Sequence, residues 1–141
     1  MKQRVVSLSD FGPAENMSLI EADIPTPGNG QIVVKNNAIG LNYLDTYFRS
    51  GLYPWPNNND IKIPGSEGVG YIHAVGSDVL DFKEGDRVSY VTPVGAYAEY
   101  AIINAAHAAK INVEVEDHDV VACTLKAVSY THLRAHETTS Y

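Results

Sequence analysis

The sequence predicts an all-β barrel or sandwich with short helices, built as one domain. Short runs rich in β-branched and aromatic residues recur about every eight to twelve residues, and turns rich in glycine and proline separate them. This spacing favours paired strands over strands that alternate with long helices. The chain has 141 residues, which suffices for one core, since domains typically run to about 100 to 150 residues.

The first three strands are marked by the turn clusters between them. Alternating or apolar runs at residues 3–8 (QRVVSL) and 17–21 (MSLIE) flank the turn sequence DFGP, which predicts two paired strands. A second breaker cluster, PTPGNG, precedes a strand rich in Ile and Val at residues 31–41.

The later elements follow the same rule. Strands are expected at residues 71–75 and 95–103. Within residues 75–88, Gly76 and Gly85 mark a turn-rich connection between two strands. A helix is expected to begin at residues 117–126, where an aspartate is available as a cap.

Between the third and fourth strands, residues 42–49 predict a short helix. Asn42 is a favourable N-cap and Gly51 is placed to end the helix. Asp45 and Arg49 are spaced i, i+4 with the acid first, which predicts an ion pair. The stripe expected to pack on the barrel consists of Leu41, Leu44 and Phe48. This pattern is complete without a ligand and by itself identifies no reaction.

Composition narrows the class of partner. The formal net charge of −7 argues against nucleic acid and anionic membranes, which require a basic surface, and favours a small molecule. No run approaches the roughly 18 apolar residues of a membrane span, and the N-terminus has no secretory pattern, so a cytoplasmic protein without membrane insertion is expected. The single cysteine, Cys123, cannot form an internal disulfide or a cysteine-paired redox motif.

The last fifteen residues change character, with two histidines and no apolar periodicity. Residues 127–138 (AVSYTHLRAHET) resemble the translation of a transposase-type sequencing-library adapter. We therefore expect the native domain to comprise residues 1–126 and residues 127–141 to be a non-native tail. A natural disordered terminus is the alternative. His132 and His136 are assigned no metal role, because two histidines without a third ligand are weak evidence for a metal site.

Five motifs carry a resemblance to a known family. They are N-x-x-D-x-Y-x-R-x-G-x-Y from residue 42, G-x-E-G-x-G from residue 65, V-G from residue 75, F-K-x-G-D-R-V from residue 82 and G-x-Y-A-E-Y from residue 95. Together they resemble the N-terminal region of the quinone oxidoreductases, the zinc-independent branch of the medium-chain dehydrogenase/reductase superfamily, over essentially all of residues 1–126. The resemblance implies a GroES-like β-barrel and, in the full family architecture, NADPH in a cleft between this barrel and a Rossmann domain. The Rossmann domain is missing from this sequence.

The same motifs argue against zinc. Zinc-dependent relatives carry a cysteine in the region of residues 42–45 and a histidine before the glutamate of the second motif, where this chain has Ser66. A catalytic zinc ion needs three convergent ligands and an open position, so no metal residues are expected. The glycines of the second motif are spaced G-x-x-G-x-G, which is not a nucleotide fingerprint and is more typical of a barrel corner. Glu67 in that motif is expected to play a structural hydrogen-bonding role.

The resemblance also implies site residues. Asn42 and Tyr53 are the candidate catalytic residues, and Tyr53 is expected to hydrogen-bond to the quinone or stack on it. The residues expected to contact the nicotinamide end of the cofactor are Asn42, Tyr43, Leu44, Asp45, Thr46 and Tyr47.

The implied function is transfer of reducing equivalents from NADPH to a quinone or another small electrophilic acceptor, without zinc, by a full-length protein that is a homodimer. As a truncated fragment, this chain is expected to be inactive by itself. Two alternatives stay open: a stand-alone GroES-like binding or interaction module, and a zinc-free reductase acting on alkenals or enones.

Overall fold

The computed structural model describes residues 1–122 and 124, and these form a mainly β structure with short helices, as the sequence predicts. Strands β1 (Lys2–Leu8) and β2 (Met17–Asp23) pair as an antiparallel hairpin, in register from Lys2 opposite Asp23 to Leu8 opposite Met17. The predicted pair of N-terminal strands is therefore confirmed.

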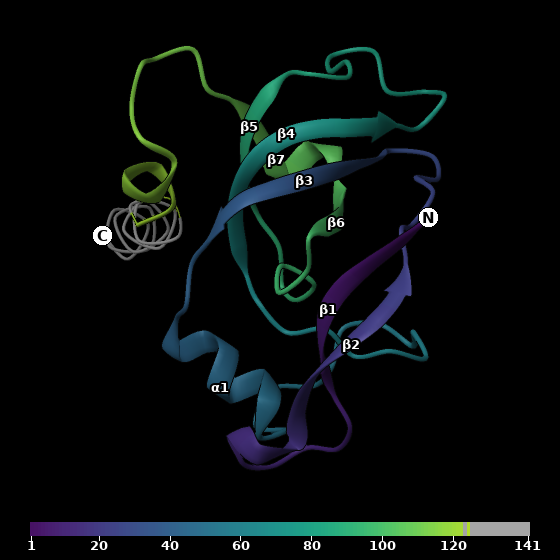
Figure 1. Cartoon of the computed structure of the whole chain (residues 1–141), viewed down its shortest axis with the longest axis vertical. Helices are drawn as coiled ribbons and strands as arrows, with labels where there is room; N and C mark the ends of the chain where they lie inside the picture. The colour runs from purple at the N-terminus through teal and green to yellow at the C-terminus, as the bar shows by residue number, and fades with distance from the viewer. Residues whose placement is uncertain (123, 125–141) are drawn as a thin grey trace, which may run out of the picture.

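A second, five-stranded sheet is antiparallel throughout and curves around the core (Figure 1), with strand order β6-β3-β4-β5-β7. Its strands are β3 (Gln31–Ile39), β4 (Glu67–Val75), β5 (Arg87–Val91), β6 (Tyr100–Asn104) and β7 (Ala108–Lys110). The central strands are rich in Val and Ile, whose branched side chains pack well on a pleated surface.

The core lies inside this curve. Its buried members are Ile32, Val34, Ile72, Val88, Tyr90, Ala96, Ala101 and Ile103. On β5 and β6 the buried members alternate with more exposed positions, which is the period of two expected for strands with one buried face. Backbone hydrogen bonds join β1 to the segments that precede β4 and β6: Val6 N–H donates to Tyr97 O at 2.9 Å, Leu8 N–H donates to Lys62 O at 2.8 Å, and Glu99 N–H donates to Arg4 O at 3.2 Å.

The helical elements are short. A 3₁₀ turn (η1, Ala14–Asn16) lies in the hairpin, and helix α1 (Tyr43–Arg49) connects β3 to the long loop before β4. A second 3₁₀ turn (η2, Ala105–His107) precedes β7, and residues 117–122 and 124 are helical. Within the part of the chain that the structure describes, no helix has the length and apolar character that a membrane span requires. Figure 1 shows α1 beside the hairpin, at the end of the molecule away from β5.

Arg87, the first residue of β5, anchors the segment that leads to the last helical residues. Its Nε donates to Asp117 Oδ1 at 2.9 Å, its Nη1 donates to Val113 O at 3.0 Å, and its Nη2 donates to Val115 O. Asn37 Nδ2 donates to the second oxygen of Asp117 at 3.0 Å. The start of this helix is therefore held to both β3 and β5.

Three details differ from the sequence-based expectations. Residues 67–70 belong to β4 and do not form a corner. Within the motif at residues 65–70, Gly65 alone has a positive φ, 104°, which is a backbone conformation that favours glycine. Strand β6 begins at Tyr100, because residues 95–99 form the crossing that meets the hairpin at an isolated bridge between Val5 and Ala98. Leu41 is 77% exposed, since it precedes α1 and points away from the core. The expectations for Cys123, His132, His136 and the tail at residues 127–141 lie outside the described residues.

Candidate functional site

The site begins where α1 leaves the sheet. Asn42 is the N-cap residue with an extended backbone (φ −133°, ψ 156°), as predicted, and its backbone N–H donates to Asp45 Oδ2 at 3.0 Å. Its side-chain amide donates to Glu67 Oε1 at 2.8 Å. Glu67 is the buried first residue of β4. The first turn of the helix is therefore tied to the sheet through a carboxylate, which gives Glu67 the structural role expected of it.

Asp45 is the least exposed residue of the predicted cofactor set, at 6%. Besides the Asn42 N–H, its Oδ2 accepts a hydrogen bond from the Tyr97 hydroxyl at 2.5 Å. Its Oδ1 is buried and has no hydrogen-bond partner among the described residues. Burial raises the pKa of Tyr97, and the hydrogen bond to the Asp45 carboxylate raises it further, so this hydroxyl remains a donor at neutral pH.

The predicted ion pair between Asp45 and Arg49 is wrong. Asp45 turns toward the barrel, where Tyr97 supplies its donor, and Arg49 turns toward the hairpin loop, where its Nε donates to Gly12 O at 3.1 Å. A fixed i, i+4 spacing allows a pair but does not select it, because an exposed pair is worth only about 0.3 to 0.5 kcal/mol and better-placed partners compete.

The outer face of α1 carries two aromatic rings. Tyr43 is 84% exposed and Tyr47 is 38% exposed, and the i, i+4 spacing puts them on one face. Thr46 lies beside them, with its hydroxyl donating to Tyr43 O at 2.6 Å. Asn42 and Leu44 are half-buried at the edge of this face. The six residues predicted for the cofactor are therefore adjacent in space, but only part of the set faces solvent.

A pocket of about 580 Å³ opens beside the helix. Tyr53 contributes to its wall, and the Tyr53 ring centroid lies 5.3 Å from that of Tyr47 and 5.6 Å from that of Phe48. The lining residues are Leu44, Phe48, Tyr53, Val91, Thr92, Pro93, Ala106, His107, Ala108 and Ala109. The candidate cofactor face and the apolar pocket are thus contiguous through the contact between Tyr47 and Tyr53.

Sequence reasoning found the helical wall of this pocket and missed the opposite wall. Thr92, Pro93 and His107 come from the ends of β5 and η2 and meet α1 only in the folded chain. No local pattern marks them, since residues on separate elements carry no shared periodicity. Tyr97 was also missed as a site residue, although it belongs to the motif that starts at residue 95.

The positions that correspond to zinc ligands in relatives hold other side chains, and each has a partner here. Ser66 is fully buried and its hydroxyl donates to Pro93 O at 3.0 Å. Within the described ranges, no group of three or more His, Cys, Asp or Glu residues is placed to hold a metal ion.

The curved antiparallel sheet, its hairpin and the inserted helix α1 define a GroES-like domain. The chain belongs to the alcohol dehydrogenase GroES-like domain family, whose profile matches residues 28–113.

Relatives and solved structures agree with this assignment. A probable quinone oxidoreductase of Schizosaccharomyces pombe is 42% identical over 116 residues, which cover 82% of this chain and 34% of that protein. A quinone oxidoreductase of Pseudomonas aeruginosa is 39% identical over 133 residues, covering 92% of this chain and 36% of that protein. The crystal structure of the Pseudomonas syringae quinone oxidoreductase superposes with a TM-score of 0.87 at 39% identity, over 93% of this chain and 40% of that one.

The resemblance to quinone oxidoreductases is therefore confirmed. The chain spans 34% and 36% of the length of the first two of these relatives. The Escherichia coli quinone oxidoreductase complexed with NADPH also superposes, with a TM-score of 0.78 at 32% identity, over 94% of this chain and 40% of that one.

Proposed function

We propose that this chain forms the barrel half of the active site of an NADPH-dependent, zinc-independent quinone oxidoreductase. The observation that carries the proposal is the continuity between the exposed aromatic face of α1 and the apolar pocket beside it. A cofactor on that face and an acceptor in that pocket would be neighbours. The similarity to quinone oxidoreductases over most of the chain supports the same arrangement.

The residues on α1 fit the nicotinamide end of NADPH. Tyr43 and Tyr47 offer open rings to a planar group, and the hydroxyl oxygen of Thr46 lies beside them as a hydrogen-bond acceptor. Asn42 lies in the same turn, with its amide donating to Glu67. Leu44 lies between this face and the pocket, which it lines. Asp45 is buried, so we assign it an indirect role, in which it orders the helix and does not contact the cofactor. When bound, NADPH supplies the hydride, so the protein needs only to orient donor and acceptor and to exclude water.

The pocket fits a small aromatic acceptor such as a quinone. Its volume of about 580 Å³ lies within the range of about 300 to 1,000 Å³ that is typical of small-molecule sites. Phe48 and Tyr53 supply apolar surface for a ring, and the Tyr53 hydroxyl can donate to a carbonyl oxygen. We assign Tyr53 to the acceptor and Asn42 to the junction between acceptor and cofactor.

The donor chemistry favours a zinc-free site. Catalytic zinc is held by thiolate, imidazole and carboxylate ligands, whereas the matching positions here carry an amide and a hydroxyl. The Asn42 amide is committed to Glu67 and the Ser66 hydroxyl to Pro93 O. Carbonyl activation by this chain would then come from hydrogen bonds, with no step through a metal.

We propose further that residues 1–126 are one part of a longer cytoplasmic, homodimeric enzyme and that residues 127–141 are a non-native tail. The wall that would cover the outer face of α1 is not supplied by the described residues, since Tyr43 is almost fully exposed. The 141-residue chain is therefore expected to show no micromolar binding in an NADPH titration, and no NADPH oxidation with benzoquinone. Sequencing the source gene across the codon for Lys126 tests the boundary, and finding the tail codons in an intact genomic read would refute it.

The function is tested on the full-length product of the source gene. NADPH oxidation is followed with benzoquinone as acceptor, and Tyr53→Phe and Asn42→Ala are compared with wild type. We expect Tyr53→Phe to raise the KM for quinone and Asn42→Ala to lower kcat. A folded wild-type protein that binds NADPH but does not reduce quinones would refute the proposal.

An activated alkene is the second candidate acceptor. A 2-haloacrylate reductase of a Burkholderia species is 31% identical over 126 residues, which cover 86% of this chain and 38% of that protein. Comparing kcat/KM for quinones and enones on the full-length product decides between the two acceptors. A natural stop codon near position 126 would instead support a stand-alone binding module.

A further inference from the structure

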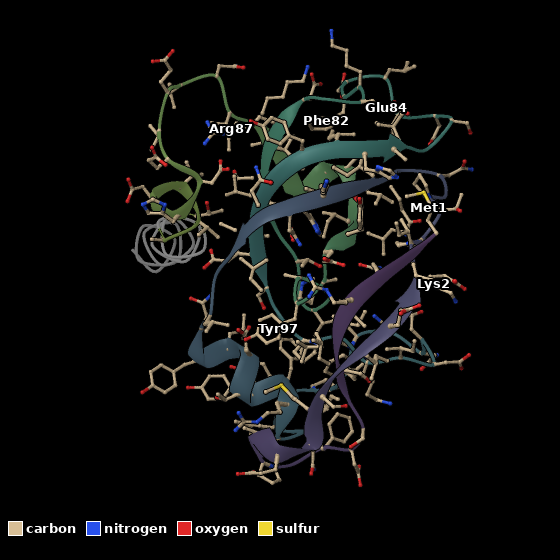
Figure 2. All side chains as sticks on the ribbon, in the orientation of Figure 1. Met1, Lys2, Phe82, Glu84, Arg87 and Tyr97 are labelled. Carbon is tan, nitrogen blue, oxygen red and sulfur yellow. The ribbon has the colours of Figure 1, made fainter. Side chains whose placement is uncertain are left out.

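We infer that Tyr97 is a positioning residue for the cofactor face of α1, acting through Asp45. The inference rests on the proposed function, because it assigns a role to a residue that supports the proposed NADPH contacts. Figure 2 shows Tyr97 between α1 and the strands of the barrel. Tyr97 lies in the crossing formed by residues 95–99, and its hydroxyl makes the side-chain hydrogen bond that joins this crossing to α1.

A chain of hydrogen bonds links Tyr97 to the helix start. The Tyr97 hydroxyl and the Asn42 backbone N–H both donate to Asp45 Oδ2, at 2.5 Å and 3.0 Å, across a sequence separation of 52 residues for the first bond. The Asn42 side chain continues the chain to Glu67. Hydrogen bonds to an ionised carboxylate are stronger than those between neutral groups. The first turn of α1 is therefore held to the barrel at two points, Tyr97 and Glu67.

Tyr97 is itself held rigidly. Its backbone N–H donates to Pro64 O at 2.9 Å, and its carbonyl oxygen accepts from Val6 N–H at 2.9 Å. Its ring packs on Gly65, where an added Cβ would lie 2.4 Å from ring atom Cδ1. A ring fixed by backbone hydrogen bonds on both sides and by a glycine contact can direct its hydroxyl to one place, as a positioning group requires.

The Tyr97 hydroxyl is one of two hydrogen-bond donors to the Asp45 side chain within the described residues. Because Oδ1 is buried without a partner, Oδ2 carries every hydrogen bond that the carboxylate makes within the described chain. Removal of the Tyr97 hydroxyl leaves a buried carboxylate with one backbone donor, which is unfavourable. Arg49, one helical turn away, is the available cation, and a swing of Asp45 toward it would pull the cap away from Asn42.

The consequence falls on the cofactor more than on the acceptor. Asn42 and Tyr43 form the turn that Asp45 caps, and the same turn supplies the proposed nicotinamide contacts. Tyr53 in the acceptor pocket is held instead to the second half of α1. Its backbone N–H donates to Tyr47 O at 3.1 Å, and its ring centroid lies 5.3 Å from that of Tyr47 and 5.6 Å from that of Phe48. Disturbing the cap therefore changes NADPH binding first.

Tyr97→Phe in the full-length product of the source gene tests this inference. We expect the Kd for NADPH, measured by fluorescence titration, and the KM for NADPH each to rise about tenfold, as for a lost hydrogen bond to a charged group. The KM for benzoquinone is expected to stay within about twofold. Tyr90→Phe is the matched control, since it deletes a buried hydroxyl that donates to Asn36 Oδ1 at 2.7 Å, and it should leave the Kd for NADPH unchanged.

Asp45→Asn provides a second variant in case Tyr97→Phe folds poorly. It weakens the same bond from the other side, so the Kd for NADPH should rise similarly and the double variant should add little to either single change. An unchanged Kd in folded Tyr97→Phe protein, or an equal rise in Tyr90→Phe, would overturn the inference.

Amide hydrogen exchange in the 141-residue chain gives a readout that is independent of activity. We expect the Asn42 amide to exchange about tenfold faster in Tyr97→Phe than in wild type, and no change there in Tyr90→Phe. If full-length wild type neither binds NADPH nor reduces an acceptor, the proposed function fails, and the exchange rates still decide whether Tyr97 positions α1. Equal exchange rates in wild type and Tyr97→Phe would refute the positioning role itself.

Discussion

Gly65→Ala is expected to destabilise the domain through two separable effects. Gly65 has a φ of 104°, a conformation that costs an L-residue about 1 to 3 kcal/mol. A Cβ there would also lie 2.8 Å from the backbone nitrogen of Tyr97 and 2.4 Å from its ring. Overpacking of this kind costs a further 1 to 3 kcal/mol, roughly. We therefore expect a total loss of about 2 to 6 kcal/mol in the free energy of unfolding.

Gly95→Ala is the matched control for the conformational part. Gly95 has a similar φ of 111°, but no atom lies within 4 Å of its added Cβ. The control should therefore lose only the first contribution. The difference between the two variants, about 1 to 3 kcal/mol, measures the contact with Tyr97.

Urea unfolding measures both variants, with the fluorescence of Trp55, the single tryptophan of the chain, as the probe. Trp55 packs near Phe48, with ring centroids 6.3 Å apart, so its signal reports on the region around α1. Far-UV circular dichroism checks that the transition is global. Equal destabilisation by the two substitutions would show that the Tyr97 ring is not held against Gly65, and would remove one support for its positioning role.

Three further predictions concern the rest of the domain. Burial acts to raise the pKa of Asp117, but hydrogen bonds from Arg87 and Asn37 and the positive charge of Arg87 lower this pKa overall. The stabilisation that the Asp117 carboxylate contributes is therefore complete above the ordinary aspartate pKa of about 3.9 and is lost as the pH falls through the lowered value. Asp117→Asn should therefore flatten the decline of thermal stability below about pH 4. Tyr90→Phe should cost about 1 to 3 kcal/mol in urea unfolding, because it leaves the Asn36 carbonyl without its hydroxyl donor. Lys2→Ala, which breaks an exposed ion pair, should change the melting temperature by only about 1 to 3 °C.

The sequence predicted the strands and the helix well because their signals are local. The hairpin follows from two apolar runs around one turn cluster, and α1 begins directly after its N-cap Asn42 and ends before Gly51, as the capping preferences of these residues indicate. Strand β7 was not predicted, since residues 108–110 (AAK) are too few to carry a periodic signal, and alanine and lysine are depleted in strands.

The site was less predictable because its decisive contacts are long-range. The spacing of Asp45 and Arg49 suggested a pair, yet the donor to Asp45 is Tyr97, which approaches only when the crossing before β6 meets the hairpin. The spacing of residues along a helix carries no information about residues outside that helix, so the hydrogen bond from Tyr97 to Asp45 could not be predicted from it. The same holds for the pocket wall formed by Thr92 and His107.

The polar groups of the site are arranged as supports more than as reagents. Asn42, Ser66 and Tyr97 each donate to another group of the protein, and two of the three acceptors, Asp45 and Glu67, are buried carboxylates. A reaction that needed a strong acid from the protein would require one of these donors to face the substrate. Hydride transfer needs instead a fixed distance between cofactor and acceptor. Under the proposed function, the domain contributes the rigid anchoring of α1 beside an apolar pocket, with the three donors turned inward and the rings of Tyr43 and Tyr47 turned outward.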